Sequence, residues 1–309
     1  MDKMLQMSAS PHIHSGISTT SIMRDVLIAL APATIAGCVI FGLRSLLVLA
    51  VCVLTSVLLE AGFNLLVKKE QTIGDLSAAV TGLLLGLNLP ANIPIWQCVV
   101  GSAFAIIVVK CLFGGIGNNL VNPAITARVF MVVAFGSMAN QAFPTIVDTA
   151  SGATPLAEIA ADKTPSIMDT FLGLTGGAIG ETCAAALLVG FVYLLVRRVI
   201  TWHIPVTFVG SVFVLSLFLE GFDVMTATAL ILSGGLLLGA IFMATDYVTS
   251  PATAWGKVIF GFGAGVITVL IRYFGVYPEG VSFAILFMNI LNPYIEKWTS
   301  RKIFGGAKA

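Results

Sequence analysis

Residues 46–67 read LLVLAVCVLTSVLLEAGFNLLV, and Glu60 is the only charged residue among them. An apolar stretch of about 20 residues is long enough for a helix to cross the hydrocarbon core of a bilayer. Segment 46–67 therefore predicts a membrane-crossing helix.

The whole chain has the composition of an integral membrane protein. Of its 309 residues, 58% are hydrophobic and 10% are charged, and the mean hydropathy is +1.01, which excludes an ordinary soluble domain. The 16 basic and 15 acidic residues nearly cancel and lie between apolar runs, so nucleic acid is not expected as a partner. The first apolar run leads straight into a second, so a cleavable signal peptide is not expected. Five cysteines without metal-ligand spacing are expected to serve as small hydrophobic residues: Cys38, Cys52, Cys98, Cys111 and Cys183.

Ten apolar runs are candidates for membrane spans, and together they predict an all-α fold. The third, fifth and tenth runs are short, as is typical of spans that Gly or Pro interrupts inside a protein-lined site. The runs are 26–43, 46–67, 76–89, 95–112, 124–138, 180–196, 205–219, 224–244, 256–274 and 281–295.

The distribution of Lys and Arg predicts the orientation of these spans. With the N-terminus in the cytoplasm, thirteen basic residues fall on the cytoplasmic side and three, Arg44, Lys163 and Arg272, on the other. Both termini are then cytoplasmic, and the segment after the fifth span is extracytoplasmic. The predicted divisions are a 1–25 N-terminal segment, a 26–138 first five-helix half, a 139–179 extracytoplasmic loop, a 180–296 second five-helix half and a 297–309 C-terminal tail.

The predicted outer loop contains a short motif, 148–154, with the sequence DTASGAT. This pattern is typical of the site where a flavin transferase esterifies the phosphate of FMN to the hydroxyl of the last threonine. Glycine and alanine keep bulk away from that hydroxyl and keep the backbone pliable. The motif residues are Asp148, Ser151, Gly152, Ala153 and Thr154.

Two pentapeptides indicate an internal repeat. The sequence GLLLG occurs at 82–86 in the third run and again at 235–239 in the eighth, the corresponding positions of two five-helix halves with opposite topology. A second pair of similar pentapeptides, NLVNP at 119–123 and NILNP at 289–293, fits two halves of opposite topology less well. Close helix packing at glycine is the alternative explanation.

Four carboxylates lie within apolar runs or at their ends, where a charge is costly and often functional. They are Glu60, Asp75, Glu181 and Asp246. A favourable interaction with the helix dipole is a sufficient explanation for Asp75 and Glu181. For Glu60 and Asp246, a functional role and a simple pairing with a neighbour stay open.

The segment 113–123 is too rich in Gly and amide side chains for a helix that faces lipid. Asn118, Asn119 and Asn122, with Glu60 and Asp246, are candidates for a cavity that binds a flavin ring or an ion. A plain cytoplasmic connector is the alternative. His12 and His14 are spaced like metal ligands, but two histidines without further ligands predict no metal site.

Six segments, which occur in order and cover nearly the whole chain, resemble the D subunits of Rnf complexes, a family related to the B subunit of the sodium-pumping NADH:quinone oxidoreductase. The segments are 10–14, 113–123, 148–156, 198–207, 244–251 and 278–293.

The resemblance implies a ten-helix membrane subunit of a ferredoxin:NAD oxidoreductase complex in the bacterial cytoplasmic membrane, with a fold similar to that of urea transporters. Thr154 would carry covalent FMN, and a second, non-covalent flavin, riboflavin or FMN, would be bound elsewhere. Implied partners are the A, B, C, E and G subunits of the Rnf complex, especially the FMN-bearing G subunit, a flavin transferase, and Na⁺ or H⁺ as the exported ion.

The chain lacks the cysteine clusters of an iron–sulfur centre and the Gly-rich fingerprint of a dinucleotide site. It is therefore expected to carry electrons as one subunit of a translocating oxidoreductase, not to be a complete enzyme. Two alternatives remain: a solute channel or secondary transporter of the urea-transporter type, which predicts no bound flavin, and a structural anchor, which predicts assembly without attached FMN.

Overall fold

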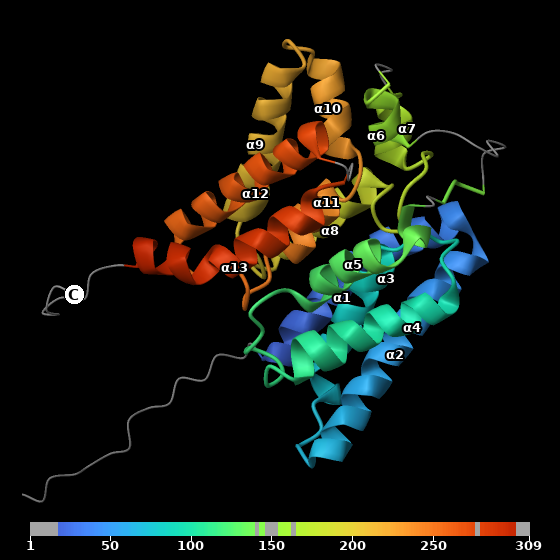
Figure 1. Ribbon diagram of the computed structural model, residues 1–309, viewed down its shortest axis with the longest axis vertical. Coiled ribbons are helices and arrows are strands. Elements are labelled where there is room, and N and C mark those ends of the chain that lie inside the picture. The colour runs from blue at the N-terminus through green and yellow to red at the C-terminus, as the bar shows by residue number, and fades with distance from the viewer. Residues whose placement is uncertain (1–17, 140–141, 146–153, 162–164, 276–278, 301–309) are drawn as a thin grey trace, which may run out of the picture.

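The computed structural model describes residues 18–139, 142–145, 154–161, 165–275 and 279–300 (Figure 1). Within these ranges the protein is all-helical and has no β-strand, and an isolated bridge joins Ala142 to Gly177. The expected all-α class is confirmed, and the apolar helices agree with a multi-pass membrane protein.

Helices occupy each of the first five apolar runs. Ser18 begins the first with a capping box, and the Asn122 side chain caps the fifth by accepting from the N–H groups of Ala124 and Ile125. Gly42, at φ +74°, separates the first two helices. The helices are α1 (Thr19–Phe41), α2 (Leu43–Val67), α3 (Ser77–Leu87), α4 (Ile95–Ala103) with its π-helical continuation η2 (Phe104–Cys111), and α5 (Pro123–Ala134).

The last five runs are also helical, but the eighth is broken. Its two parts meet at 63°, because Ser233 is extended and Gly234 has φ +65°. The eighth predicted run, 224–244, is therefore helical but bent. The elements are α8 (Ala184–Val196), α9 (His203–Leu219), α10 (Val224–Leu232), α11 (Leu236–Leu238) with its π-helical continuation η4 (Gly239–Met243), α12 (Ala254–Phe274) and α13 (Val281–Thr299).

Helix length separates the spans into two groups. By length and composition, α1, α2 and α12 can cross a membrane, and the bent pair formed by α10 with α11 and η4 can act as a fourth span. The apolar helices of 10–17 residues are α3, the α4–η2 segment, α5, α8 and α9, and α13 has 19 residues.

Short helices connect these elements. They are η1 (Ile73–Asp75) before α3, η3 (Gly136–Ala139) after α5, α6 (Pro155–Ile159) and α7 (Ile167–Leu172). Both α6 and α7 pack against α10 and lie at the upper right of Figure 1.

Hydrogen bonds from the Thr226 hydroxyl and the Met225 N–H to Asp223, just before α10, lower the pKa of that carboxyl.

The molecule has two opposite faces. The N-terminal face is the end where α1 begins. The Thr154 face is the opposite end, where the last turn of α1 meets Thr145, whose N–H donates to the Ile40 carbonyl at 2.9 Å. The last carbonyl of α3 lies at this second face too, because the Gly180 N–H donates to Leu87 at 2.8 Å.

Glycines of the repeated pentapeptide allow close packing. A Cβ at Gly82 would stand 2.6 Å from the Cys52 carbonyl of α2, and one at Gly239 would stand 2.6 Å from a Val281 methyl. Larger residues at either position would push neighbouring helices apart. All five cysteines are free, and Cys52, Cys98 and Cys111 are buried, as expected of small hydrophobic residues.

Candidate functional site

Thr154 is the N-cap of α6. Its Oγ1 accepts from the Ala157 N–H at 3.3 Å, and Pro155 follows at the first helical position. The threonine is half-buried at the start of the described segment 154–161. The other predicted attachment residues, Asp148, Ser151, Gly152 and Ala153, lie outside the described residues, as do His12 and His14.

Thr154 borders a pocket, here called the Thr154 pocket, with an empty volume of about 420 Å³ including its open mouth. Among the described residues, its lining side chains include two carboxylates and five hydroxyls and no side-chain nitrogen. The polar lining residues are Thr154, Thr170, Thr175, Glu181, Thr182, Ser233 and Glu279.

Behind this pocket, Arg128 joins two carboxylates that are distant in sequence. Its NH1 lies 2.6 Å from Glu181 Oε1 and donates to Asn88 Oδ1 at 2.6 Å, and its NH2 pairs with Glu279. Arg128 and Glu181 are 3% exposed. A buried guanidinium needs such partners, because an uncompensated charge in this environment is costly.

The break in the eighth span completes this arrangement. Arg272 donates to the carbonyls of Leu230 and Ser233, at 2.6 and 3.1 Å, and so caps the end of α10. Gly235, just before α11, leaves room for the carboxylate of Glu181: a Cβ there would stand 2.5 Å from Oε1. Arg128, Glu181, Arg272 and Glu279 are called the charge cluster below.

The segment that carries Thr154 touches this break directly. A Cβ at Gly234 would stand 2.9 Å from Leu156 and 3.4 Å from Arg272 NH2. Leu156 is two residues after Thr154, so the predicted attachment site and the helix break are adjacent.

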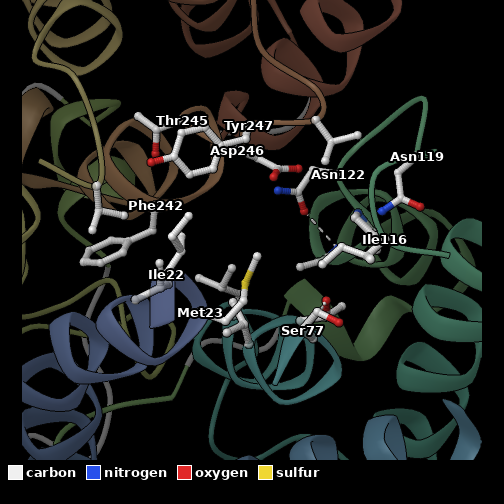
Figure 2. Close-up of a pocket in the computed structure, with 18 of the residues that line it drawn as sticks. Ile22, Met23, Ser77, Ile116, Asn119, Asn122, Phe242, Thr245, Asp246 and Tyr247 are labelled. Carbon is white, nitrogen blue, oxygen red and sulfur yellow. Dashed lines mark hydrogen bonds between the residues drawn. The ribbon is translucent and has the colours of Figure 1, made fainter. Parts of the chain in front are cut away.

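A second cavity, here called the Asn122 cavity, opens at the N-terminal face, with an empty volume of about 810 Å³ including its open mouth (Figure 2). Figure 2 shows Asn119, Asn122 and Asp246 on one side of it, and the apolar side chains of Ile22 and Phe242 on the other. The structure therefore brings together three of the five residues predicted for a flavin or ion cavity.

Asn122 ties the two halves of the chain together at this cavity. Its Nδ2 donates to the Met243 carbonyl at 3.3 Å. With the Asn289 amide nitrogen turned to the Thr249 carbonyl (3.1 Å), the Asn289 oxygen accepts from the Asn122 N–H at 3.2 Å. Asp246 accepts from the Thr249 hydroxyl at 3.1 Å.

Glu60 and Asn118 do not line the cavity. Glu60 lies behind its wall, where Lys110 Nζ contacts Glu60 Oε2 at 2.8 Å and Ser77 Oγ at 2.5 Å. Lys110 and Ser77 do line the cavity. Asn118 is exposed on the preceding loop.

The carboxylates flagged in the sequence have different surroundings. Asp75 accepts from the Ser77 N–H at 2.8 Å at the start of α3, which agrees with the helix-start interpretation. Glu181 precedes α8 by three residues and lies instead beside Gly235 at the start of α11, with Arg128 as its partner.

The sequence did not reveal which basic residues pair with the buried carboxylates. The orientation rule places Lys110 and Arg128 among the cytoplasmic charges, whereas both are buried in ion pairs. Each interrupts a predicted apolar run, a signal that could have marked them as interior. Their partners lie 50, 53 and 151 residues away, so the pairing itself has no local signal.

The Asn122 cavity combines apolar and amide surfaces, which could hold a flavin. Apolar side chains such as Met23 and Phe242 can cover the ring, while the amides of Asn119 and Asn122 can meet its polar edge. Asn119 Oδ1 is buried and has no hydrogen-bond partner within the described residues. An unsatisfied polar atom on the wall indicates a ligand or water there.

Comparison with known proteins gives a full-length match. The model of the NQR2, RnfD, RnfE family matches residues 6–305. The D subunit of the Na⁺-translocating ferredoxin:NAD⁺ oxidoreductase complex of Acetobacterium woodii is 47% identical, over 98% of this chain and 96% of that protein. The D subunit of the proton-translocating ferredoxin:NAD⁺ oxidoreductase complex of Clostridium ljungdahlii is 37% identical, over 96% and 95%. The D subunit of the ion-translocating oxidoreductase complex of Halorhodospira halophila is 33% identical, over 98% and 96%. With relatives this similar along their full lengths, the chain belongs to the NQR2, RnfD, RnfE family.

Proposed function

We propose that this chain is the D subunit of an ion-translocating ferredoxin:NAD⁺ oxidoreductase complex. It would carry electrons across the bacterial cytoplasmic membrane and couple their flow to export of Na⁺ or H⁺. Full-length relatives that bear this name support the proposal. The observation that carries the mechanism is the pair of cavities at opposite faces, one of which borders Thr154.

Thr154 would hold FMN through a phosphoester. Its position at the rim of a polar pocket, with its hydroxyl engaged by a single N–H at 3.3 Å, supports this assignment. The flavin would supply the one-electron and two-electron chemistry, and the protein would position it and tune its electrostatics.

A second, non-covalent flavin would occupy the Asn122 cavity. Asn119 and Asn122 would meet its polar edge, while Ile22, Met23 and Phe242 would cover its ring. The eight residues of α11 and η4 join the two cavities: the segment begins next to Gly234 in the Thr154 pocket and reaches Phe242 in the Asn122 cavity. At 1.5 Å per residue this is about 12 Å, a short path for an electron.

The topology would be ten crossings in two inverted five-helix halves, similar to urea transporters, with both termini cytoplasmic and segment 139–179 outside. Packing of α1 on α8 and of α5 on α13 supports the repeat, because each pair joins corresponding helices of the two halves. The remaining Rnf subunits, especially the FMN-bearing G subunit, and a flavin transferase would be the partners.

The proposal is tested by measuring covalent attachment of FMN to Thr154. The chain is co-expressed with a flavin transferase as wild type and as Thr154→Ala, then run on a denaturing gel under ultraviolet light and weighed by intact-protein mass spectrometry. We expect a fluorescent wild-type band with the added mass of FMN less one water, and a dark Thr154→Ala band of unmodified mass.

A known covalent flavoprotein made with the same transferase is the positive control. A dark wild-type band beside a glowing control would contradict the assignment and favour the solute channel. None of the relatives named above is a solute channel, so we place that alternative second.

A further inference from the structure

Within the described residues, the side chains that line the Thr154 pocket offer only oxygen as a polar atom, which the attachment of a flavin does not explain. They are carboxylates and hydroxyls, while the two guanidiniums of the charge cluster lie behind the lining, with Arg128 NH1 2.6 Å from Glu181 Oε1. A hard cation prefers such oxygen ligands.

Two buried oxygens in this pocket lack partners. Glu181 is 3% exposed and Thr182 is 6% exposed. Glu181 Oε2 and Thr182 Oγ1 have no hydrogen-bond partner in the part of the chain that the structure describes. Buried polar atoms are nearly always paired, so two unpaired oxygens on adjacent residues of one pocket indicate a ligand or water there.

We propose that Glu181 and Thr182 bind a sodium ion in the Thr154 pocket. Water molecules and other oxygens of the lining would complete its shell, since the pocket, whose empty volume of about 420 Å³ includes its mouth, is open to solvent. The carbonyls at the end of α10 contribute less to the sodium shell, because Arg272 already donates to those of Leu230 and Ser233.

The net charge of the charge cluster links sodium binding at this site to the redox state of the group on Thr154. The charge cluster holds two carboxylates and two guanidiniums, so its formal charge is zero. An electron arriving at the group on Thr154 adds one negative charge beside the pocket, and binding of one Na⁺ restores neutrality. This coupling rests on the proposed function, in which reduced ferredoxin supplies the electron through the partner subunits; the sodium site itself rests on the pocket.

The first experiment measures binding of ²²Na⁺ by equilibrium dialysis to the purified whole complex, oxidised and electrochemically reduced, at equal total Na⁺. We expect the wild type to bind one more Na⁺ per copy of this chain when reduced. Thr182→Val is expected to weaken this binding about tenfold, because one ligand is lost, and Glu181→Gln to remove it.

Thr182→Val also separates ligand loss from misfolding. The Thr182 hydroxyl has no protein partner within the described residues, so the substitution removes no internal hydrogen bond. Assembly of the variant is checked by size-exclusion chromatography and by the mass of the attached flavin. Glu220→Gln is the matched control, since Glu220 accepts from the Tyr273 hydroxyl at 2.6 Å and does not line the pocket. Its sodium binding is expected to be unchanged.

The second readout is the midpoint potential of the Thr154 flavin. It is expected to rise by up to about 59 mV per tenfold increase in Na⁺ in the wild type, for one cation per electron, and to be independent of Na⁺ in Glu181→Gln.

Equal sodium binding by wild type and assembled Thr182→Val would overturn the site. A wild-type potential that follows pH but not Na⁺ would also overturn it and would assign Glu181 to protons. Either result with the FMN mass present leaves the proposed function intact. If the mass is absent, the proposed function fails, and the comparison of dialysed wild type with Thr182→Val still decides the site.

Discussion

At the scale of single residues, buried ion pairs are the feature with the clearest consequences. Lys110 and Glu60 are 2% and 3% exposed and 2.8 Å apart, with Ser77 and Thr72 as further partners of the pair. Removing one member of such a pair leaves a buried charge without compensation, while removing both can be nearly neutral.

We therefore expect Lys110→Met to destabilise the protein by about 3–5 kcal/mol. The double variant Lys110→Met with Glu60→Gln should recover much of this loss. The measurement is the thermal midpoint of the detergent-solubilised protein by size-exclusion chromatography after heating. A double variant that is no more stable than Lys110→Met would show that Glu60 is not held by Lys110.

Gly235 gives a second prediction at this scale. Gly235→Ala would place its methyl group 2.5 Å from Glu181 Oε1 and 3.0 Å from Arg128 NH1. The carboxylate must then move, so we expect a loss of about 1–3 kcal/mol in stability. Gly210→Ala is the control, because its Cβ would meet nothing within 4 Å. Equal thermal midpoints of the two variants would argue against the tight fit.

The sequence indicated some of these residues and not others, for a physical reason. Thr154 belongs to a contiguous motif, and Asn119, Asn122 and Asp246 stand out as polar residues near apolar runs. Arg128 acquires its role only when Glu181 and Glu279 fold onto it. That contact depends on tertiary packing, which residue spacing along one helix does not encode.

At the scale of helices, hydrophobic run length predicted the elements well. The start of α4 and the ends of α2, α8, α9 and α12 coincide with the predicted limits. The break in the eighth span was missed, although GG at 234–235 precedes its second part. Glycines also serve close packing, so the sequence alone did not separate a bend from a contact.

Helix packing at Gly82 can be tested against a glycine without neighbours. Gly82→Ala would bring a methyl group within 2.6 Å of the Cys52 carbonyl and 2.9 Å of Val53 Cα. Because backbone atoms cannot rotate away, we expect destabilisation of about 1–3 kcal/mol. Gly62→Ala in α2 meets nothing within 4 Å and should stabilise by up to about 1 kcal/mol, since Ala favours a helix more than Gly does. Similar thermal midpoints for both variants would contradict the packing of α3 on α2.

At the scale of the whole molecule, the two cavities open at opposite faces, and the proposed topology assigns a compartment to each. Glu70 lies on the exposed connection after α2, and Thr20 binds the neighbouring Gly74 carbonyl at 3.3 Å, which places this connection at the N-terminal face. Ala160 is exposed directly after α6, on the Thr154 side.

In a background without native cysteines, Ala160→Cys should therefore react with a membrane-impermeant maleimide added to intact spheroplasts. Glu70→Cys should react only after permeabilisation. Labelling is read as a mass shift on a gel, with total reactivity in detergent as the control for accessibility. Reaction of Glu70→Cys in intact spheroplasts would reverse the proposed orientation.

The buried leucines of α11, the segment that joins the two cavities, have a consequence for the energy balance of the cell. Leu85, Leu236 and Leu238 have no exposed surface, and they lie in α3 and α11. Moving a bare ion into such a medium costs on the order of 20 kcal/mol, whereas an electron tunnels through closely packed aliphatic side chains. The buried leucines of α11 would thus exclude ions while letting an electron pass, so a subunit at rest would not discharge the gradient that its working complex creates.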